Sequence, residues 1–216
     1  MLELSSMEKI SEILQVEKLV SNCDLVIFDL DDTLYLEKDY VKSGFAEVSK
    51  NFLQIKDMAN KLWQAFELGK KSINSVLEEH GLLTQENLDL AISVYRNHLP
   101  NISLADGVKD MLLRLKANGK KLGLITDGRP QGQRNKICAL QIEDIFDKII
   151  VTDELGGVEY RKPNPKAFEE MVKHFNLSYE RSVYIGDNPK KDFIAPISLK
   201  MACIHFENPN GLYFEK

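Results

Sequence analysis

The 216-residue sequence contains few cysteines and no long hydrophobic run. Its three cysteines, Cys23, Cys138 and Cys203, lie far apart and are odd in number, which argues against a disulfide framework and against a zinc site. No segment approaches the roughly 18 uninterrupted apolar residues that cross a bilayer. Residues 1–22 lack the apolar core and cleavage site of a secretory signal. We therefore expect a cytoplasmic protein whose thiols are reduced and mostly buried.

Dense blocks of lysine and arginine are also missing, and the formal net charge is -5. Nucleic acids and anionic membranes attract clustered positive charge, so we expect neither as a partner. No Gly-rich fingerprint follows the first predicted strand, which disfavours a dinucleotide-binding enzyme. The length suits one large domain, or a core with a small insert, and we expect a monomer or a homodimer.

Short apolar runs that end in polar clusters alternate with amphipathic segments of helical length. The runs that we predict to be strands are residues 25–28, 122–125, 149–151, 183–185 and, with a weaker pattern, 202–204. Continuous apolar runs are typical of strands covered on both faces, and the alternation with helices predicts parallel pairing. We therefore predict an α/β fold with a Rossmann-like parallel sheet. The amphipathic segment 7–20 is predicted to be a helix packed on the outside.

A different texture occupies the segment between the first two strands. It carries no strand signal, and its apolar residues recur at helical spacing. Gly69 and Gly81 are predicted to end helices, and Thr84 to cap the next one. We predict that residues 38–99 form an inserted all-helical domain, whose aromatic residues pack in its own core. Residues 1–37 and 100–216 would then form the α/β core.

The first polar cluster is Asp29-Leu30-Asp31-Asp32-Thr33, directly after a predicted strand. In open parallel sheets ligands bind beyond the carboxyl ends of the strands. Alternation along the chain points Asp29 and Asp31 in similar directions, and such carboxylates repel each other unless a cation or a proton intervenes. The alternative interpretation is an ordinary surface turn, which Asp and Thr also favour.

Two further clusters follow the next two strands. Thr126 and Asp127 offer a hydroxyl and backbone N–H groups that suit a phosphate oxygen, although a plain helix cap has the same composition. Lys162 lies in a loop stiffened by Pro163 and Pro165. Its ammonium could neutralise a phosphate and a carboxylate, or it could be a solvated lysine before a helix.

The fourth cluster, residues 186–192, contains Asp187 and Asp192 after another strand. Oxygen ligands without His or Cys suit a hard cation such as Mg²⁺, whereas Asp192 alone could be a first-turn helix residue. The four clusters occur in order, each at a strand end. Together they supply the carboxylates, hydroxyl and lysine that metal-assisted phosphoryl transfer requires, so chance is a poor explanation.

These four clusters resemble the motifs of the haloacid dehalogenase-like hydrolase superfamily, from residue 25 to about residue 204. The helical insert resembles the C1-type cap of its phosphatase branch. The resemblance implies that Asp29 is the nucleophile and forms an aspartyl-phosphate. It implies that Asp31 acts as general acid and then as general base, and that Lys162 neutralises charge at the transferring group.

The resemblance also implies a ligand set for Mg²⁺ and for the phosphate. The metal would be held by Asp29, by the backbone carbonyl of Asp31 and by Asp187, with Asp192 binding directly or through water. Thr126 and the backbone N–H of Asp127 would hold phosphoryl oxygens. Asp127 stands where relatives frequently have Asn, so we expect a cation near it.

Arg129 or Arg161 could answer that charge or grip an anionic part of the substrate. The expected function is Mg²⁺-dependent hydrolysis of a phosphate monoester on a small phosphorylated metabolite. A phosphomutase of the same superfamily is the alternative. A non-hydrolytic phospho-acceptor domain fits less well, because that fold has no helical insert after its first strand. An idle binding scaffold is disfavoured, because every reactive position is filled.

Overall fold

The centre of the molecule is a six-stranded parallel sheet. The structure, a computed structural model, describes residues 7–212 and residue 214. The strand order is β1-β6-β5-β2-β3-β4, and all neighbouring strands are parallel. The strands are β1 (Glu8–Ile10), β2 (Leu25–Phe28), β3 (Lys121–Thr126), β4 (Lys148–Val151), β5 (Ser182–Gly186) and β6 (Ala202–Phe206). The predicted α/β fold is confirmed.

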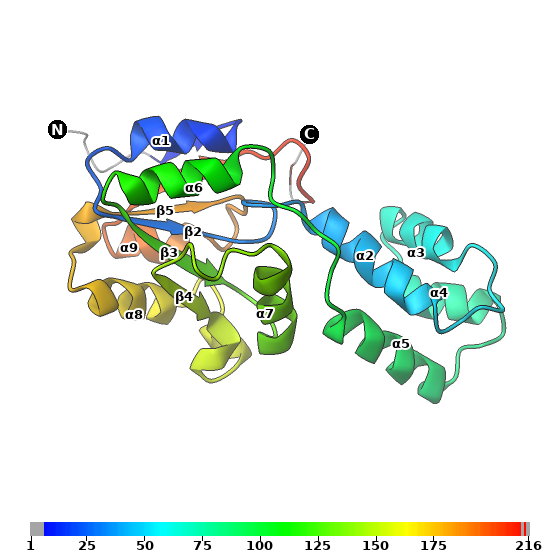
Figure 1. The fold of residues 1–216 in the computed structure, drawn as a ribbon. Coiled ribbons are helices and arrows are strands. Elements are labelled where there is room, and N and C mark those ends of the chain that lie inside the picture. The colour runs from blue at the N-terminus through cyan, green and yellow to red at the C-terminus, as the bar shows by residue number, and fades with distance from the viewer. Residues whose placement is uncertain (1–6, 213, 215–216) are drawn as a thin grey trace.

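Helices cover both faces of this sheet (Figure 1). On one face, Val26 and Phe28 of β2 join the cluster that includes α1 (Val16–Leu19), α6 (Val108–Ala117) and α7 (Pro130–Ala139). On the other face, Leu25 and Ile27 pack with α8 (Lys166–Phe175) and α9 (Ile194–Ser198). Each fully buried Leu, Ile, Val or Phe contributes roughly 1.5–3 kcal/mol of hydrophobic free energy. Burial on both faces is the reason that this strand is apolar throughout.

Four helices between β2 and β3 form a separate lobe to one side of the core (Figure 1). They are α2 (Glu37–Ser49), α3 (Met58–Glu67), α4 (Ser72–Glu79) and α5 (Gln85–Asn97). Their buried side chains form their own hydrophobic cluster, with Trp63, Phe66 and Tyr95 packed against it. The helical insertion is therefore confirmed, while boundaries at residues 38 and 99 stay a prediction. We call this lobe the cap.

The predicted helix ends and the predicted helix cap within the inserted segment are confirmed. Gly69 and Gly81 have φ angles of 67° and 66°, in the left-handed region that glycine tolerates, and each lies two residues beyond a helix end. Thr84 caps α5, since its hydroxyl accepts a hydrogen bond from the N–H of Asn87 at 3.2 Å.

The predicted helix over residues 7–20 is wrong. The segment forms β1, which pairs with β6 at the sheet edge, a 3-10 turn (Ile13–Gln15) and the one-turn helix α1. Ile10, Ile13, Val16 and Val20 are all buried in the core cluster. Their helix-like spacing is satisfied by three consecutive short elements, so periodicity alone misassigned the segment.

The cysteines are mostly buried, as expected from the sequence. Cys23 and Cys203 are buried, Cys138 is exposed, and all three are free. In the part of the chain that the structure describes, every helix is too short or too polar to cross a membrane.

Candidate active site

The sheet order brings three of the four clusters to one edge. Asp29 directly follows β2, which lies between β3 and β5. Thr126 is the last residue of β3, and Asp187 directly follows β5. Because neighbouring strands are parallel, their carboxyl ends lie together. The remaining cluster, the loop with Lys162, follows β4 through two 3-10 turns, Thr152–Leu155 and Val158–Tyr160.

Lys162 is the link between two carboxylates. Its Nζ lies 2.7 Å from Oδ1 of Asp29 and 2.7 Å from Oδ1 of Asp192, and it donates to the hydroxyl of Tyr184 at 2.8 Å. Its side chain has no exposed surface. Burial by itself would lower the pKa of Lys162, but the carboxylates of Asp192 and Asp29 outweigh burial and raise the pKa well above its usual value. The ammonium therefore stays charged at neutral pH.

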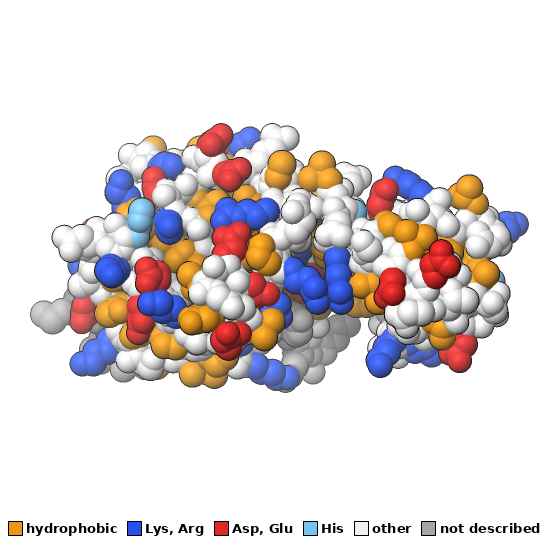
Figure 2. Space-filling view, turned by 90° about the horizontal axis from the view of Figure 1, so that it is seen from below, with side chains coloured by type: hydrophobic (Ala, Val, Ile, Leu, Met, Phe, Trp, Pro, Cys, Tyr) orange, Lys and Arg blue, Asp and Glu red, His pale blue; other side chains and the backbone are white. Residues whose placement is uncertain are grey.

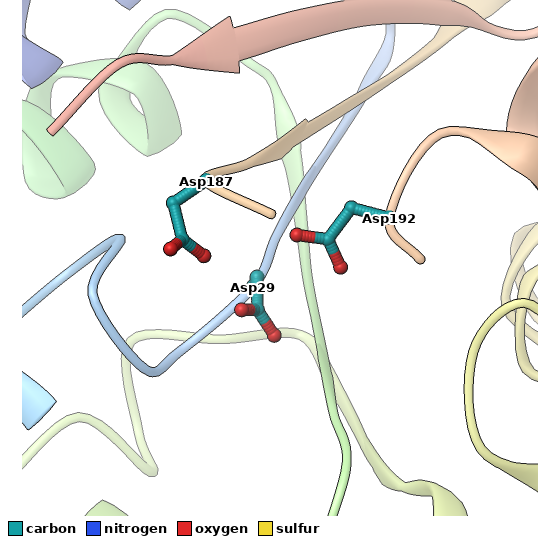
Figure 3. A group of neighbouring side chains, drawn as sticks. All are labelled: Asp29, Asp187 and Asp192. Atoms are coloured by element: carbon teal, nitrogen blue, oxygen red, sulfur yellow. The ribbon is translucent and has the colours of Figure 1, made fainter. Parts of the chain in front are cut away.

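Three buried carboxylates, one of which is Asp29, converge at the ends of the strands (Figure 3). Asp29, Asp187 and Asp192 each offer an oxygen, and these oxygens all lie within 4.8 Å of one another. Burial, reinforced by the carboxylates of Asp29 and Asp192, raises the pKa of Asp187 to about 9. Burial also raises the pKa of Asp29, although Lys162 opposes this shift. Among the residues the structure describes, no lysine or arginine pairs with Asp187.

The carboxylate cluster therefore has an excess of negative charge, which suits a bound divalent cation. Three carboxylate oxygens without nitrogen or sulfur ligands form the donor set that a hard ion such as Mg²⁺ prefers. The raised pKa of Asp187 gives the same indication, because a bound cation would offset the burial and the neighbouring carboxylates that disfavour its ionised form.

Asp192 is held in one position by its surroundings. Its Oδ2 accepts a hydrogen bond from the N–H of Asn188 at 2.9 Å, while Oδ1 meets Lys162. A Cβ added to Gly186 would lie 2.6 Å from Oδ2 of Asp192. Glycine at position 186 therefore lets this carboxylate lie directly against the strand end.

Asp31 does not join the three-carboxylate cluster. Its Oδ1 accepts from Nζ of Lys136 at 2.7 Å and from the hydroxyl of Tyr35, and its Oδ2 accepts from Nε2 of Gln133 at 3.0 Å. Burial would raise the pKa of Asp31, but Lys136 and these hydrogen bonds outweigh burial and hold the pKa below its usual value. The expected metal contact through its backbone carbonyl stays a prediction.

Sequence reasoning missed the partners of Asp31 and Thr126. Gln133 and Lys136 lie on the buried side of α7, and Gln133 also donates to the hydroxyl of Thr126. The Lys136 ammonium lies 4.3 Å from the ring centre of Tyr40 in the cap helix α2. The sequence did contain a pattern that could have identified these partners. Positions 133, 136, 137 and 140 form one helix face, which is half polar and half apolar. Polar side chains on a core-facing stripe indicate a buried partner.

Asp127 is held away from the carboxylate cluster by its own contacts. Its Oδ1 accepts from the Thr152 hydroxyl and from the N–H of Lys162, both at 3.0 Å, and its Oδ2 pairs with Lys191 at 3.3 Å. The cation that pairs with Asp127 is therefore Lys191, and neither expected arginine. Arg161 instead forms a two-bond pair with Asp153 at 2.7 Å and lies near Asp127 only at longer range.

A family model described as haloacid dehalogenase-like hydrolase matches residues 26–206. The chain belongs to this family. The matched span runs from the second residue of β2 to the last residue of β6, so it contains the whole site and the cap.

Relatives with assigned activities include two glyceraldehyde 3-phosphate phosphatases. The protein from Methanocaldococcus jannaschii is 32% identical over 184 residues, which cover 77% of each chain. That from Pyrococcus abyssi is 26% identical over 200 residues, 85% of this chain and 81% of the relative. A solved HAD-hydrolase, YfnB from Bacillus subtilis, bound to magnesium, has a TM-score of 0.63 at 20% identity and covers 85% of this chain and 86% of its own. This haloacid dehalogenase-like hydrolase is a phosphoric monoester hydrolase.

Proposed function

We propose that the chain is a Mg²⁺-dependent phosphohydrolase that cleaves a small phosphate monoester through an aspartyl-phosphate on Asp29. The observation that carries the proposal is the buried arrangement in which Asp29 meets Lys162 at 2.7 Å and faces Asp187 and Asp192. A carboxylate held by a charged lysine and two further carboxylates is suited to nucleophilic attack on phosphorus.

In the first half of the reaction, an oxygen of Asp29 forms a bond to phosphorus and the bond from phosphorus to the ester oxygen breaks. Asp31 gives its proton to that leaving oxygen. The Thr126 hydroxyl and the backbone N–H of Asp127 hold phosphoryl oxygens, and Lys162 offsets the charge that accumulates beside Asp29. Thr126 is fully buried and bound to Gln133, which keeps its hydroxyl in one place.

In the second half, Asp31 accepts a proton from a water molecule whose oxygen attacks phosphorus. The bond between Asp29 and phosphorus breaks, and inorganic phosphate leaves. Lys136 supports this half, because the carboxylate form that it stabilises is the form that accepts the proton.

Asp29, Asp187 and Asp192 would hold Mg²⁺, with the backbone carbonyl of Asp31 as a further ligand. The bound ion would supply positive charge at the phosphoryl oxygens and at the carboxylates. The three converging carboxyl groups and the raised pKa of Asp187, which a bound cation would lower, support this assignment.

The substrate is a small phosphorylated metabolite. Support comes from relatives named glyceraldehyde 3-phosphate phosphatase and pyrimidine 5'-nucleotidase, which share between 23% and 32% of aligned residues with this chain. These names define a size range and an ester class, so a screen should span three-carbon phosphates, sugar phosphates and nucleoside monophosphates.

The test is release of inorganic phosphate from such a panel, with Mg²⁺ and with excess EDTA. We expect the unmodified protein to release phosphate with Mg²⁺ but not with excess EDTA. Asp29→Asn should release phosphate only at the background rate. Asp24→Asn is the matched control, since Asp24 precedes the same strand and forms an exposed pair with Arg181 at 2.6 Å. Its activity should equal that of the unmodified protein. Equal activity in Asp29→Asn would overturn the proposal.

A further inference from the structure

A groove lies between the cap helix α5 and the first turn of α7. It encloses about 630 Å³, and its lining includes Asp89, Ser93 and Arg96 of α5 and Arg129 and Gly132 beside and within α7. Figure 2 shows Lys and Arg side chains gathered at the junction of the larger and smaller lobes. The groove is therefore cationic on the side nearest to the core.

The pairing of the arginines singles out this groove. The sequence has six arginines. Four of them make two hydrogen bonds to one carboxylate, in the pairs Arg114–Glu17, Arg134–Glu154, Arg161–Asp153 and Arg181–Asp24. The other two, Arg96 and Arg129, form neither an ion pair nor a hydrogen bond within residues 7–212 and 214, and both line the groove.

Two guanidinium groups without an ion pair among the described residues lie on one concave surface, and such a surface can bind an anion. Guanidinium binds carboxylate or phosphate through two parallel hydrogen bonds, as the other four arginines of this chain do with carboxylates. Ser93 adds a hydroxyl on the same side of α5 as Arg96, one helical turn away.

The start of α7 connects the groove to the phosphate site. Arg129 is three residues after Thr126, and Gln133, which contacts Thr126 and Asp31, lies one helical turn further along α7. One turn rises about 5.4 Å, so a short substrate can reach from one site into the other. The walls are held together, because Nδ2 of Asn135 donates to the carbonyls of Asn97 and His98 at 3.0 Å each.

We propose, building on the proposed function, that this groove binds a second acidic group on the alcohol part of the ester. That group is a carboxylate or a second phosphate, and it makes acidic phosphate esters better substrates than neutral ones. Asp89, which Gln85 holds at 2.9 Å, lies two helical turns from Arg96 on α5. Its charge limits how far an anion extends and favours a hydroxyl beyond the acidic group.

The test compares esters that differ only in the second group. One arm pairs 3-phosphoglycerate with glycerol 3-phosphate, and the other pairs fructose 1,6-bisphosphate with fructose 6-phosphate. We expect the unmodified enzyme to show higher kcat/KM for the acidic member of at least one pair. Arg96→Gln should lower that preference roughly tenfold, the size of one charge-assisted hydrogen bond. Arg134→Gln, on α7 but paired with Glu154, should leave the preference unchanged.

Calorimetric binding of the same esters to Asp29→Asn, with and without Arg96→Gln, separates the groove from catalysis. Weaker binding of the acidic ester alone in Arg96→Gln supports the groove as an anion site. The inference would be overturned if the unmodified enzyme had the same kcat/KM for both members of each pair. It would also be overturned if Arg96→Gln and Arg129→Gln left both the preference for the acidic ester and its binding unchanged. Absence of turnover with every ester would overturn the proposed function, while the binding comparison would still decide the role of the groove.

Discussion

Replacing Lys162 by methionine tests the electrostatic reasoning directly. The ammonium is buried without exposed surface and lies 2.7 Å from both Asp29 and Asp192. Methionine fills a similar volume but leaves Asp29 and Asp192 without the ammonium that pairs with both of them. Breaking a buried ion pair by removing one partner costs about 3–5 kcal/mol, because the remaining charge is still buried. For a chain of this length that loss lowers Tm by roughly 6–20 °C.

The loss should depend on pH in a defined direction. Without Lys162, the pKa of Asp29, already raised by burial, rises further. A carboxyl whose folded pKa lies above its unfolded value of about 3.9 loses stability as pH rises between the two values. Lys162 itself stays charged over this range, since its pKa is well above the usual value. The loss in free energy of unfolding caused by Lys162→Met should therefore be larger at pH 8 than at pH 5.

Urea unfolding at pH 5 and pH 8, without divalent ions, measures this difference. Lys166→Met is the matched control, because Lys166 forms an exposed pair with Glu170 at 2.8 Å; it should change stability little at either pH. Added Mg²⁺ should restore part of the loss in Lys162→Met by neutralising the same carboxylates. Equal stability of the two variants, or a deficit independent of pH, would refute the reasoning.

Three further predictions concern the same site. Gly186→Ala should destabilise the protein by about 1–3 kcal/mol in urea unfolding and weaken Mg²⁺ binding, because the new Cβ would lie 2.6 Å from Oδ2 of Asp192; unchanged Mg²⁺ affinity would contradict this. Lys136→Met should move the acidic limb of the kcat profile upward by roughly 1–3 pH units, because it removes the cation that lowers the pKa of Asp31. Apparent Mg²⁺ affinity, measured by calorimetry, should rise from pH 6 to pH 9 with proton release, because Asp187, with a pKa raised to about 9, must lose its proton to bind; an affinity independent of pH would exclude this.

Strands buried on both faces could be predicted closely from the sequence. The run over residues 25–28 coincides with β2, and the other four runs lie within their strands. Burial on both sides requires an uninterrupted apolar run, which is visible in a single sequence. β1 escaped detection because it has only three residues and only Ile10 is buried. Its assignment depends on pairing with β6, almost two hundred residues away.

The parallel sheet also accounts for the positions of the site residues that were predicted. Asp29, Thr126 and Asp187 lie together because their strands are neighbours with aligned carboxyl ends. Their catalytic and metal-binding roles stay predictions. The side-chain partners of these residues could not be predicted in the same way. Asp127 pairs with Lys191, 64 residues away, rather than with a nearby arginine. Such pairs depend on loop course and helix rotation, which periodicity does not specify.

The contact of Asp31 with Lys136 has the largest consequence for the mechanism. A residue that acts first as acid and then as base must hold a proton for one half of the cycle and release it for the other. Lys136 favours the carboxylate, so in the free protein Asp31 is ready for the second half and not for the first. The negative charge of an arriving phosphate raises the proton affinity of Asp31 and opposes Lys136. We therefore expect substrate binding to raise the pKa of Asp31, so that Asp31 takes up a proton from solvent and then gives it to the leaving oxygen.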